Sequence, residues 1–209
     1  MEKWNAGPAY RIETNNLTIR CYSPSDADPL AKSVLESVEH LKPWMPWAHD
    51  EPEPIETKIN RLRYFRANFD LDKEYVYGIF NKDETELIGG CGLHPRVGVE
   101  AMAIGYWINV NHVKKGFGAE CAGVLTKIGF EINSLKRIEI HCDPNNVASA
   151  SIPRKLGFTL DAVLPKRTPN EKGELRDSMV WSIFRDQYTR SKIHGMALKA
   201  YNAIGNQIL

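Results

Sequence analysis

The chain has 209 residues, of which 25% are charged, and its formal net charge is only +1. Such a balance argues against a nucleic-acid-binding surface built on bulk positive charge, and no apolar run approaches the roughly 20 residues that span a bilayer. The N-terminus also lacks the apolar stretch of a secretory signal peptide. We therefore expect one cytoplasmic domain over residues 1–209, with a core over residues 17–188 and no contact with membranes or nucleic acids.

The first half of the chain predicts strands and two helices. Residues 17–22 (LTIRCY) are β-rich and alternate apolar with polar side chains, which indicates a strand. Ser25 and Asp28 resemble a capping box at the start of a helix whose apolar stripe continues to Leu41. Four prolines and two tryptophans in residues 42–54 exclude a regular element there. A helix is then predicted over 55–69, and strands over 75–80, 87–94 and 101–110.

The second half predicts the longest helix, which begins near Gly116 and contains Gly123 and Gly129. Glycine inside a helix costs up to about 1 kcal/mol relative to alanine, so close packing against a sheet is the expected reason for both. A strand follows over 137–142, and the strand–helix–strand order requires that this strand run parallel to the strand at 101–110. A short helix over 147–156, strands over 158–163 and 177–184, and a helical tail over 186–209 complete the prediction.

A basic loop at residues 111–120 (NHVKKGFGAE) connects a strand to the long helix. Helix N-termini present free N–H groups and about half a positive charge, so they bind phosphate oxygens. Gly116 and Gly118 would let the backbone approach a diphosphate, and Lys114 and Lys115 add positive charge. The patterns GxGxxG and GxxxxGK[ST] are absent, which disfavours nicotinamide and ATP. Alone, the loop is equally compatible with an ordinary strand–helix turn.

The cysteines and histidines show no metal-binding pattern. The four cysteines form no CxxC pair, so we expect buried, reduced thiols. The histidines also lack the spacing of metal ligands, and no metal is assigned.

A second segment, residues 143–158 (DPNNVASASIPRKLGF), sharpens the interpretation of the loop. The order of an IGYW strand (residues 104–107), a glycine-containing loop, a DPxNxxS turn and a KLGF helix end resembles the GNAT acetyltransferase superfamily, and within it the ribosomal-protein N-acetyltransferase-like group. KPWMPW at residues 42–47 and GELRDSMVWSI at residues 173–183 are similar to the same group. The resemblance implies an α+β fold: a mixed, mostly antiparallel twisted sheet, flanked by helices, with one parallel strand pair splayed at the cofactor site.

The resemblance also implies that acetyl-CoA is the cosubstrate. Val113 replaces the Gln or Arg that begins the family's loop pattern, a modest loss because backbone N–H groups make most of these contacts. Residues 108–110 would meet the pantetheine arm through backbone hydrogen bonds, and Asn146 and Ser149 would lie near the pantetheine and the thioester. Lys155 is either a ligand of a coenzyme phosphate or a solvated lysine. The cofactor-binding residues so implied are Ile108, Asn109, Val110, Val113, Lys114, Lys115, Gly116, Phe117, Gly118, Ala119, Asn146, Ser149 and Lys155.

The acid and base of the family are not at their usual positions. Many members use a Glu on the strand before the loop as general base, and this chain has Ala103 there. Glu100 and His94 are the alternatives, and the imidazole has a suitable intrinsic pKa of about 6.5. Some members protonate the leaving thiolate with a Tyr at a position that Pro153 occupies here. Ser149 is therefore the candidate donor.

The aromatic segment 44–47 (WMPW) is expected either to form a wall of the acceptor pocket or to pack over the edge of the core. Trp44, Trp47 and Tyr106 are the candidate acceptor-binding residues, although Tyr106 and Trp107 must point to opposite faces of their strand. Three acidic residues follow the aromatic segment and would either attract a cationic amine or form a solvated charged run. They are Asp50, Glu51 and Glu53.

The sequence thus predicts an acetyl-CoA-dependent N-acetyltransferase acting on a primary amine, foremost a protein N-terminal α-amine. Deprotonating an α-amine at pH 7 costs about 1 kcal/mol, against roughly 4–5 kcal/mol for a lysine, so an α-amine suits a site without an obvious base. A small amine or antibiotic as acceptor, a non-catalytic acyl-CoA-binding module and a nucleotide-binding domain of another fold are the alternatives. The oligomeric state, including a homodimer, stays open.

Overall fold

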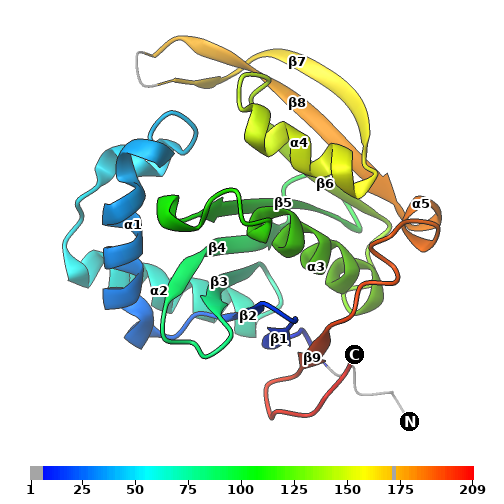
Figure 1. Cartoon of the computed structure of the whole chain (residues 1–209), viewed down its shortest axis with the longest axis horizontal. Helices are drawn as coiled ribbons and strands as arrows, with labels where there is room; N and C mark the ends of the chain where they lie inside the picture. The colour runs from blue at the N-terminus through cyan, green and yellow to red at the C-terminus, as the bar shows by residue number, and fades with distance from the viewer. Residues whose placement is uncertain (1–6, 171–172) are drawn as a thin grey trace.

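The computed structural model describes residues 7–170 and 173–209. These residues form one nine-stranded sheet in the order β7-β8-β6-β5-β4-β3-β2-β1-β9 (Figure 1). The strands are β1 (Arg11–Glu13), β2 (Leu17–Cys21), β3 (Tyr75–Asn81), β4 (Leu87–His94), β5 (Ala101–Ile108), β6 (Arg137–Cys142), β7 (Thr159–Pro169), β8 (Leu175–Phe184) and β9 (Lys199–Tyr201). The α-helices are α1 (Ala27–Leu41), α2 (Ile55–Asp70), α3 (Phe117–Glu131), α4 (Val147–Leu156) and α5 (Arg185–Thr189).

One strand pair of the described sheet, β5 with β6, is parallel, and the other neighbours are antiparallel. The parallel pairing runs from Ala101–Arg137 to Ile104–Ile140 and ends there, although β5 continues to Ile108. Beyond Ile104 the two strands separate. This arrangement confirms the predicted mixed, mostly antiparallel sheet with one splayed parallel pair.

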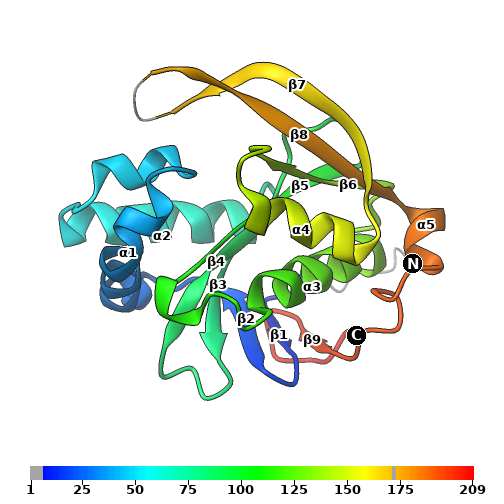
Figure 2. The same ribbon diagram turned by 45° about the horizontal axis from the view of Figure 1, so that its top comes forward.

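Helices cover both faces of the sheet, with α1 and α2 on one face and α3 and α4 on the other (Figures 1 and 2). Leu30 and Val34 bury the apolar stripe of α1, and Val124 and Ile128 bury that of α3. Gly129 lies close to β6, because a Cβ there would stand 2.6 Å from the Ile138 side chain. That contact accords with the close packing expected for this glycine. None of the described helices is long and apolar enough to cross a membrane.

The start of α1 differs from the prediction. The capping box is formed by Ser23 and Asp26, one turn of 3-10 helix precedes the α-helix, and the α-helix begins at Ala27. The Asp26 carboxylate accepts the Ser23 main-chain N–H (2.7 Å) and also binds the Arg20 guanidinium (2.8 Å). Because this carboxylate has partners on two segments, it fixes the cap two residues earlier than Ser25.

The expected helical tail over 186–209 is wrong. The helix α5 ends at Thr189, and after a turn the chain forms β9, which pairs antiparallel with β1. The Ala200 main-chain N–H also binds the Leu209 carbonyl (3.0 Å), so the C-terminus folds back onto β9. The outer edge of β1 needs a partner for its main-chain groups, and the tail supplies it. The sheet therefore extends beyond the expected core of residues 17–188.

Gly89 on β4 leaves no room for a side chain. A Cβ at this position would lie 2.2 Å from the Trp107 carbonyl oxygen on β5. Because that obstacle is backbone, Gly89→Ala should lower the free energy of unfolding by about 2 kcal/mol, measured by urea denaturation. Gly195→Ala is the matched control, since its nearest atom would be the Lys192 carbonyl oxygen at 3.9 Å. Equal stability of the two variants would contradict the prediction.

Candidate active site

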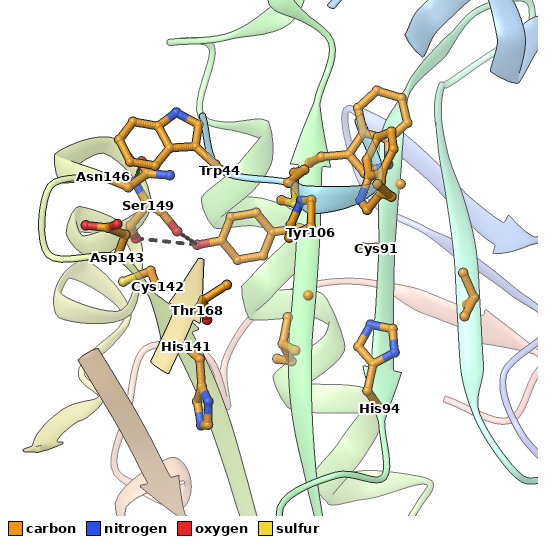
Figure 3. A pocket seen from close by; sticks show the side chains of 18 of the residues that line it. Trp44, Cys91, His94, Tyr106, His141, Cys142, Asp143, Asn146, Ser149 and Thr168 are labelled. Carbon is orange, nitrogen blue, oxygen red and sulfur yellow. Dashed lines mark hydrogen bonds between the residues drawn. The ribbon is translucent and has the colours of Figure 1, made fainter. Parts of the chain in front are cut away.

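A cavity of about 970 Å³ opens where β5 and β6 separate. Its walls come from α1 and α2, from the segment around the 3-10 helix η2 (Pro46–Asp50), from β4 and β5, from the end of β6 with the start of α4, and from the β7–β8 hairpin. Figure 3 shows side chains from these elements converging on the space beside β5. Segments distant in sequence thus share one cavity.

Successive side chains of β5 place different chemistry on the two faces of the sheet. Tyr106 packs against the core beneath α3, and Trp107 packs against the core beneath α1 and α2. Trp107 meets the Trp47 ring edge-on, with ring centroids 6.0 Å apart. Both Tyr106 and Trp107 line the cavity, which therefore reaches both faces through the gap between β5 and β6.

On the α3–α4 face, Tyr106 and Ser149 form a hydroxyl pair. Their oxygens lie 3.0 Å apart, and Figure 3 shows the two side chains pointing toward each other across the gap. Asn146 caps α4 by accepting the Ser149 main-chain N–H (3.0 Å), which fixes the position of Ser149. Burial raises the pKa of Tyr106 above its ordinary value, so this hydroxyl remains a proton donor throughout the physiological range.

Cys142 lines the same part of the cavity. Burial raises the pKa of its thiol, which keeps it protonated and weakly nucleophilic. All four cysteines are free and buried, as expected from the sequence. Among the described residues, no group of three or more His, Cys, Asp and Glu side chains is arranged to hold a metal ion.

On the opposite face, His94 forms a dyad with Glu74. The Nδ1 of His94 donates to the Glu74 carboxylate (2.6 Å). That hydrogen bond lowers the pKa of Glu74, so the carboxylate is ionised at neutral pH. The His94 ring lies over Gly92 and Gly105, where a Cβ on either residue would approach it to about 3.0 Å. With Nδ1 committed to Glu74, Nε2 of His94 is free to accept a proton.

A second imidazole–carboxylate pair lies on β6, and sequence reasoning missed it. His141 lines the cavity, and its Nε2 donates to Glu139 (2.6 Å). His94 and His141 stand on the two strands that flank β5 (Figure 3). The alternating pattern of residues 137–142 (RIEIHC) could have revealed this pair, because Glu139 and His141 are two residues apart on a strand and therefore share a face.

Glu100, the other candidate base, is not among the described residues that line the cavity. It stands at the start of β5 with φ 54°, its side chain is half exposed, and it pairs with Lys136 (2.6 Å). The positive φ turns the chain into β5 and directs this carboxylate to the surface. Of the two candidate bases, the structure brings only His94 into the cavity.

The loop over residues 113–119 has the geometry of an anion-binding helix start. Gly116 adopts φ 87° and Lys114 φ 62°, and both residues are exposed. The Glu120 main-chain N–H binds the Gly116 carbonyl (3.0 Å), which leaves the N–H groups of the first three helical residues free of main-chain partners. Those residues are Phe117, Gly118 and Ala119.

Two other predicted cofactor ligands already have partners within the protein. The Asn109 side chain is buried and donates to Ser33 Oγ (2.9 Å), and its main-chain N–H binds the Ile88 carbonyl (2.7 Å). The Val110 N–H binds a helix α1 hydroxyl, Ser37 Oγ, at 3.0 Å. The bonds to Ser33 and Ser37 attach residues 109–110, at the end of β5, to α1. Lys155, by contrast, is exposed in the last turn of α4.

Trp44 and Trp47 both line the cavity, and Trp47 also packs against the core beneath α1 and α2. Of the acidic run beyond them, Asp50 is exposed, whereas Glu51 and Glu53 are paired with cations of α2. Lys58 is 2% exposed and binds Glu51 at 2.5 Å. Arg61 binds Glu53 at 2.5 Å. Burial of these pairs requires that each carboxylate keep its cation.

Two curated proteins show the relationship in sequence. The uncharacterized N-acetyltransferase YoaA of Bacillus subtilis is 27% identical over 175 residues, which cover 83% of this chain and 96% of that protein. The ribosomal protein uS5-alanine N-acetyltransferase of Escherichia coli is 26% identical over 156 residues, which cover 72% of this chain and 79% of that protein.

Solved structures share the fold. RimL, a ribosomal L7/L12 alpha-N-protein acetyltransferase in complex with coenzyme A, has a TM-score of 0.76 at 19% identity, covering 83% of this chain and 97% of that chain. Mycobacterium smegmatis RimJ in complex with CoA-disulfide has a TM-score of 0.75 at 22% identity, covering 90% of each chain. The family model described as an acetyltransferase (GNAT) domain matches residues 16–159, more than half of the chain. The chain therefore belongs to the GNAT acetyltransferases and is an N-acetyltransferase enzyme.

Proposed function

We propose that this enzyme transfers the acetyl group of acetyl-CoA to a peptide N-terminal α-amine. The observation that carries the proposal is the gap between β5 and β6, which joins a hydroxyl pair on one face to an imidazole dyad on the other. A relative of the chain is named for acetylating a ribosomal-protein alanine, and related folds are described in complex with coenzyme A. Both descriptions support the proposed donor and acceptor.

The loop over residues 113–119 fits the coenzyme diphosphate. Its free N–H groups, the positive end of α3 and the side chains of Lys114 and Lys115 would hold the phosphates. The Glu120 carboxylate does not compete for this place, because it accepts hydrogen bonds from Thr14 (2.6 Å) and Asn16 (3.0 Å). The pantetheine arm would then follow β5 to the gap beside Ser149.

Acetyl-CoA supplies a thioester, whose C–S bond breaks as the new C–N bond forms. Nε2 of His94 takes the proton from the attacking amine, and the ionised Glu74 stabilises the resulting imidazolium. Ser149 donates a hydrogen bond to the leaving sulfur, and the Tyr106 hydroxyl orients it. A thiol with a pKa near 8.5 leaves with little acid assistance. Holding amine and thioester in the gap supplies the larger share of the rate.

The cost of deprotonation supports an α-amine acceptor over a lysine side chain. At pH 7 the α-amine requires about 1 kcal/mol and the lysine ammonium roughly 4–5 kcal/mol. An imidazole base suits the smaller requirement, because the buried carboxylates of the cavity wall, Glu51 and Asp143, are already paired with Lys58 and Arg176.

The test is to mix the pure protein with acetyl-CoA and a panel of α-amine peptides, lysine peptides and small amines while following the release of free thiol. Thiol release with α-amine peptides supports the proposal. Release with small amines alone would assign the enzyme to small-molecule acceptors. Binding of CoA by calorimetry with no thiol release on any acceptor would indicate an acyl-CoA-binding module instead.

Ser149→Ala should lower kcat about tenfold while leaving the Kd for CoA within about twofold, because one hydrogen bond to the sulfur is lost in the transition state. Tyr106→Phe removes the orienting hydroxyl and should give a smaller loss. Steady-state thiol release gives kcat, and calorimetry gives Kd. A Ser149→Ala variant with normal turnover and weakened CoA binding would contradict the assigned role. Ser151→Ala is the matched control, because Ser151 lies on the same helix outside the cavity wall and its hydroxyl donates to the Ala148 carbonyl.

A further inference from the structure

The carboxylates in the cavity wall are all held by the protein. Glu51 is bound to the buried Lys58 (2.5 Å), and Asp143 lies 3.3 Å from the Arg176 guanidinium. Asp177 accepts a main-chain N–H from β7 (3.0 Å). Since each carboxylate has a protein partner, the wall offers an incoming acceptor little free negative charge.

Two arginines of the cavity wall have protein partners. Arg61 binds Glu53, and Arg176 binds the Pro43 carbonyl at 2.5 Å. Arg96 and Arg167 also line the cavity, yet within the described residues neither guanidinium has a hydrogen-bond or ion-pair partner. These two side chains, hereafter the arginine pair, are exposed and positively charged at every physiological pH.

The fold brings Arg167 to the cavity through an irregularity in the hairpin. Between Leu164 and Thr168, three residues of β7 stand against the single residue Asp177 of β8. Lys166, in the middle, adopts φ 54°, and its N–H is the one that Asp177 accepts. Bulges of this kind redirect side chains and are frequent beside active sites. The Asp177 carboxylate thus stabilises the bulge that places Arg167 in the cavity wall.

Arg96 lies two residues beyond His94, the candidate base at the end of β4. Its main-chain N–H binds the His94 carbonyl (2.9 Å), which ties the two residues together. The hydrogen bond from the His94 ring and, to a smaller extent, the positive charge of Arg96 lower the pKa of the Glu74 carboxylate. This charge interaction and the shared cavity wall place Arg96 near the His94–Glu74 dyad, where the amine would be deprotonated.

We propose that the arginine pair selects acceptors that carry a carboxylate near the reacting amine, so that the preferred peptide N-terminus is followed by acidic side chains. The inference rests on the proposed function. Guanidinium groups bind carboxylates through paired hydrogen bonds. A cavity lined by positive charge also attracts negatively charged ligands. Unpaired positive charge beside the amine also favours its neutral form, which is the form that attacks the thioester.

The test compares peptides that begin with the same alanine and carry Asp or Glu at the next three positions with matched Asn or Gln peptides. We expect kcat/KM to be about tenfold higher for the acidic peptides, the effect of one charge-assisted hydrogen bond. Free aspartate and glutamate form a second arm, which distinguishes a small amino dicarboxylate from a peptide. Raising the salt concentration to 0.5 M, roughly a 4 Å screening length, should reduce the preference.

Arg96→Gln and Arg167→Gln should each move the acidic-to-neutral ratio toward one, and the double variant should abolish the preference. Arg63→Gln, on the exposed surface of α2 and outside the cavity wall, is the matched control and should retain the ratio. A ratio of one for the parent enzyme, or an unchanged ratio in the double variant, would overturn the inference.

Calorimetry with the same peptides and the CoA-loaded protein separates this inference from the proposed function. Acetylation of neutral and acidic peptides at equal rates, with equal affinities, would retain the function and reject the arginine pair. Tighter binding of acidic peptides without thiol release would retain the arginine pair as a carboxylate receptor and reject the transferase assignment to peptides. Absence of both binding preference and turnover would reject both.

Discussion

The His94→Gln variant is expected to acetylate an N-terminal peptide about 1,000-fold more slowly than the parent enzyme at pH 7. Glutamine retains a polar side chain of similar reach but cannot accept the proton of the attacking amine. The loss should fall on kcat, measured by thiol release at saturating acetyl-CoA, because His94 lies outside the loop at residues 113–119 that would hold the coenzyme.

The pH profile distinguishes a lost base from a damaged fold. An α-amine with a pKa of about 8 is mostly neutral at pH 9, so the rate of the variant should recover by about tenfold between pH 7 and pH 9. The Glu74 carboxylate is already ionised over this range, because the hydrogen bond from His94 lowers its pKa. A constant deficit across the range would argue against the assignment of His94 as base.

Two further histidine variants serve as controls. His194→Gln alters an exposed ring outside the cavity wall and should keep full activity. His141→Gln tests the second dyad, which Glu139 completes. If His141→Gln shows the large loss and His94→Gln does not, the base is on β6 instead of β4.

The Gly118→Trp variant should bind CoA at least about 100-fold more weakly than the parent, the equivalent of two lost charge-assisted hydrogen bonds. Gly118 is the second residue of α3, where a side chain would project between Ile108 and Ile152 at the start of the helix. An indole there would occupy the path that the diphosphate would take, in the proposed function, to the free N–H groups. Isothermal calorimetry measures the change.

Circular dichroism and thermal unfolding establish that the Gly118→Trp variant is folded. Gly195→Trp places the same ring in open space on the surface and should leave CoA affinity unchanged. If Gly118→Trp is folded and binds CoA normally, the coenzyme does not use this helix start.

Much of the fold follows from local pattern. Alternation identifies the strands from β2 to β8, and the run of apolar residues from Cys121 to Ile128 identifies α3. The strand–helix–strand order fixes the parallel pair, because a parallel crossover needs a helix of this length. The αL conformation of Gly116 and the cap at Asn146 are also local, since both depend on neighbours within a few residues. The sequence by itself thus determined the conformation of the loop at residues 113–119 and of the turn that holds Ser149.

Tertiary structure alone decided the chemistry around those elements. The His94–Glu74 dyad joins residues 20 positions apart, and the pairing of β9 with β1 joins the two ends of the chain. Lys58 and Arg61 are paired with Glu51 and Glu53 of the acidic run, whereas Arg96 and Arg167 have no hydrogen-bond or ion-pair partner among the described residues. Such effects depend on which side chains meet across the sheet and on how exposed they are to water. Neither the contacts nor the exposure can be read from spacing along the chain.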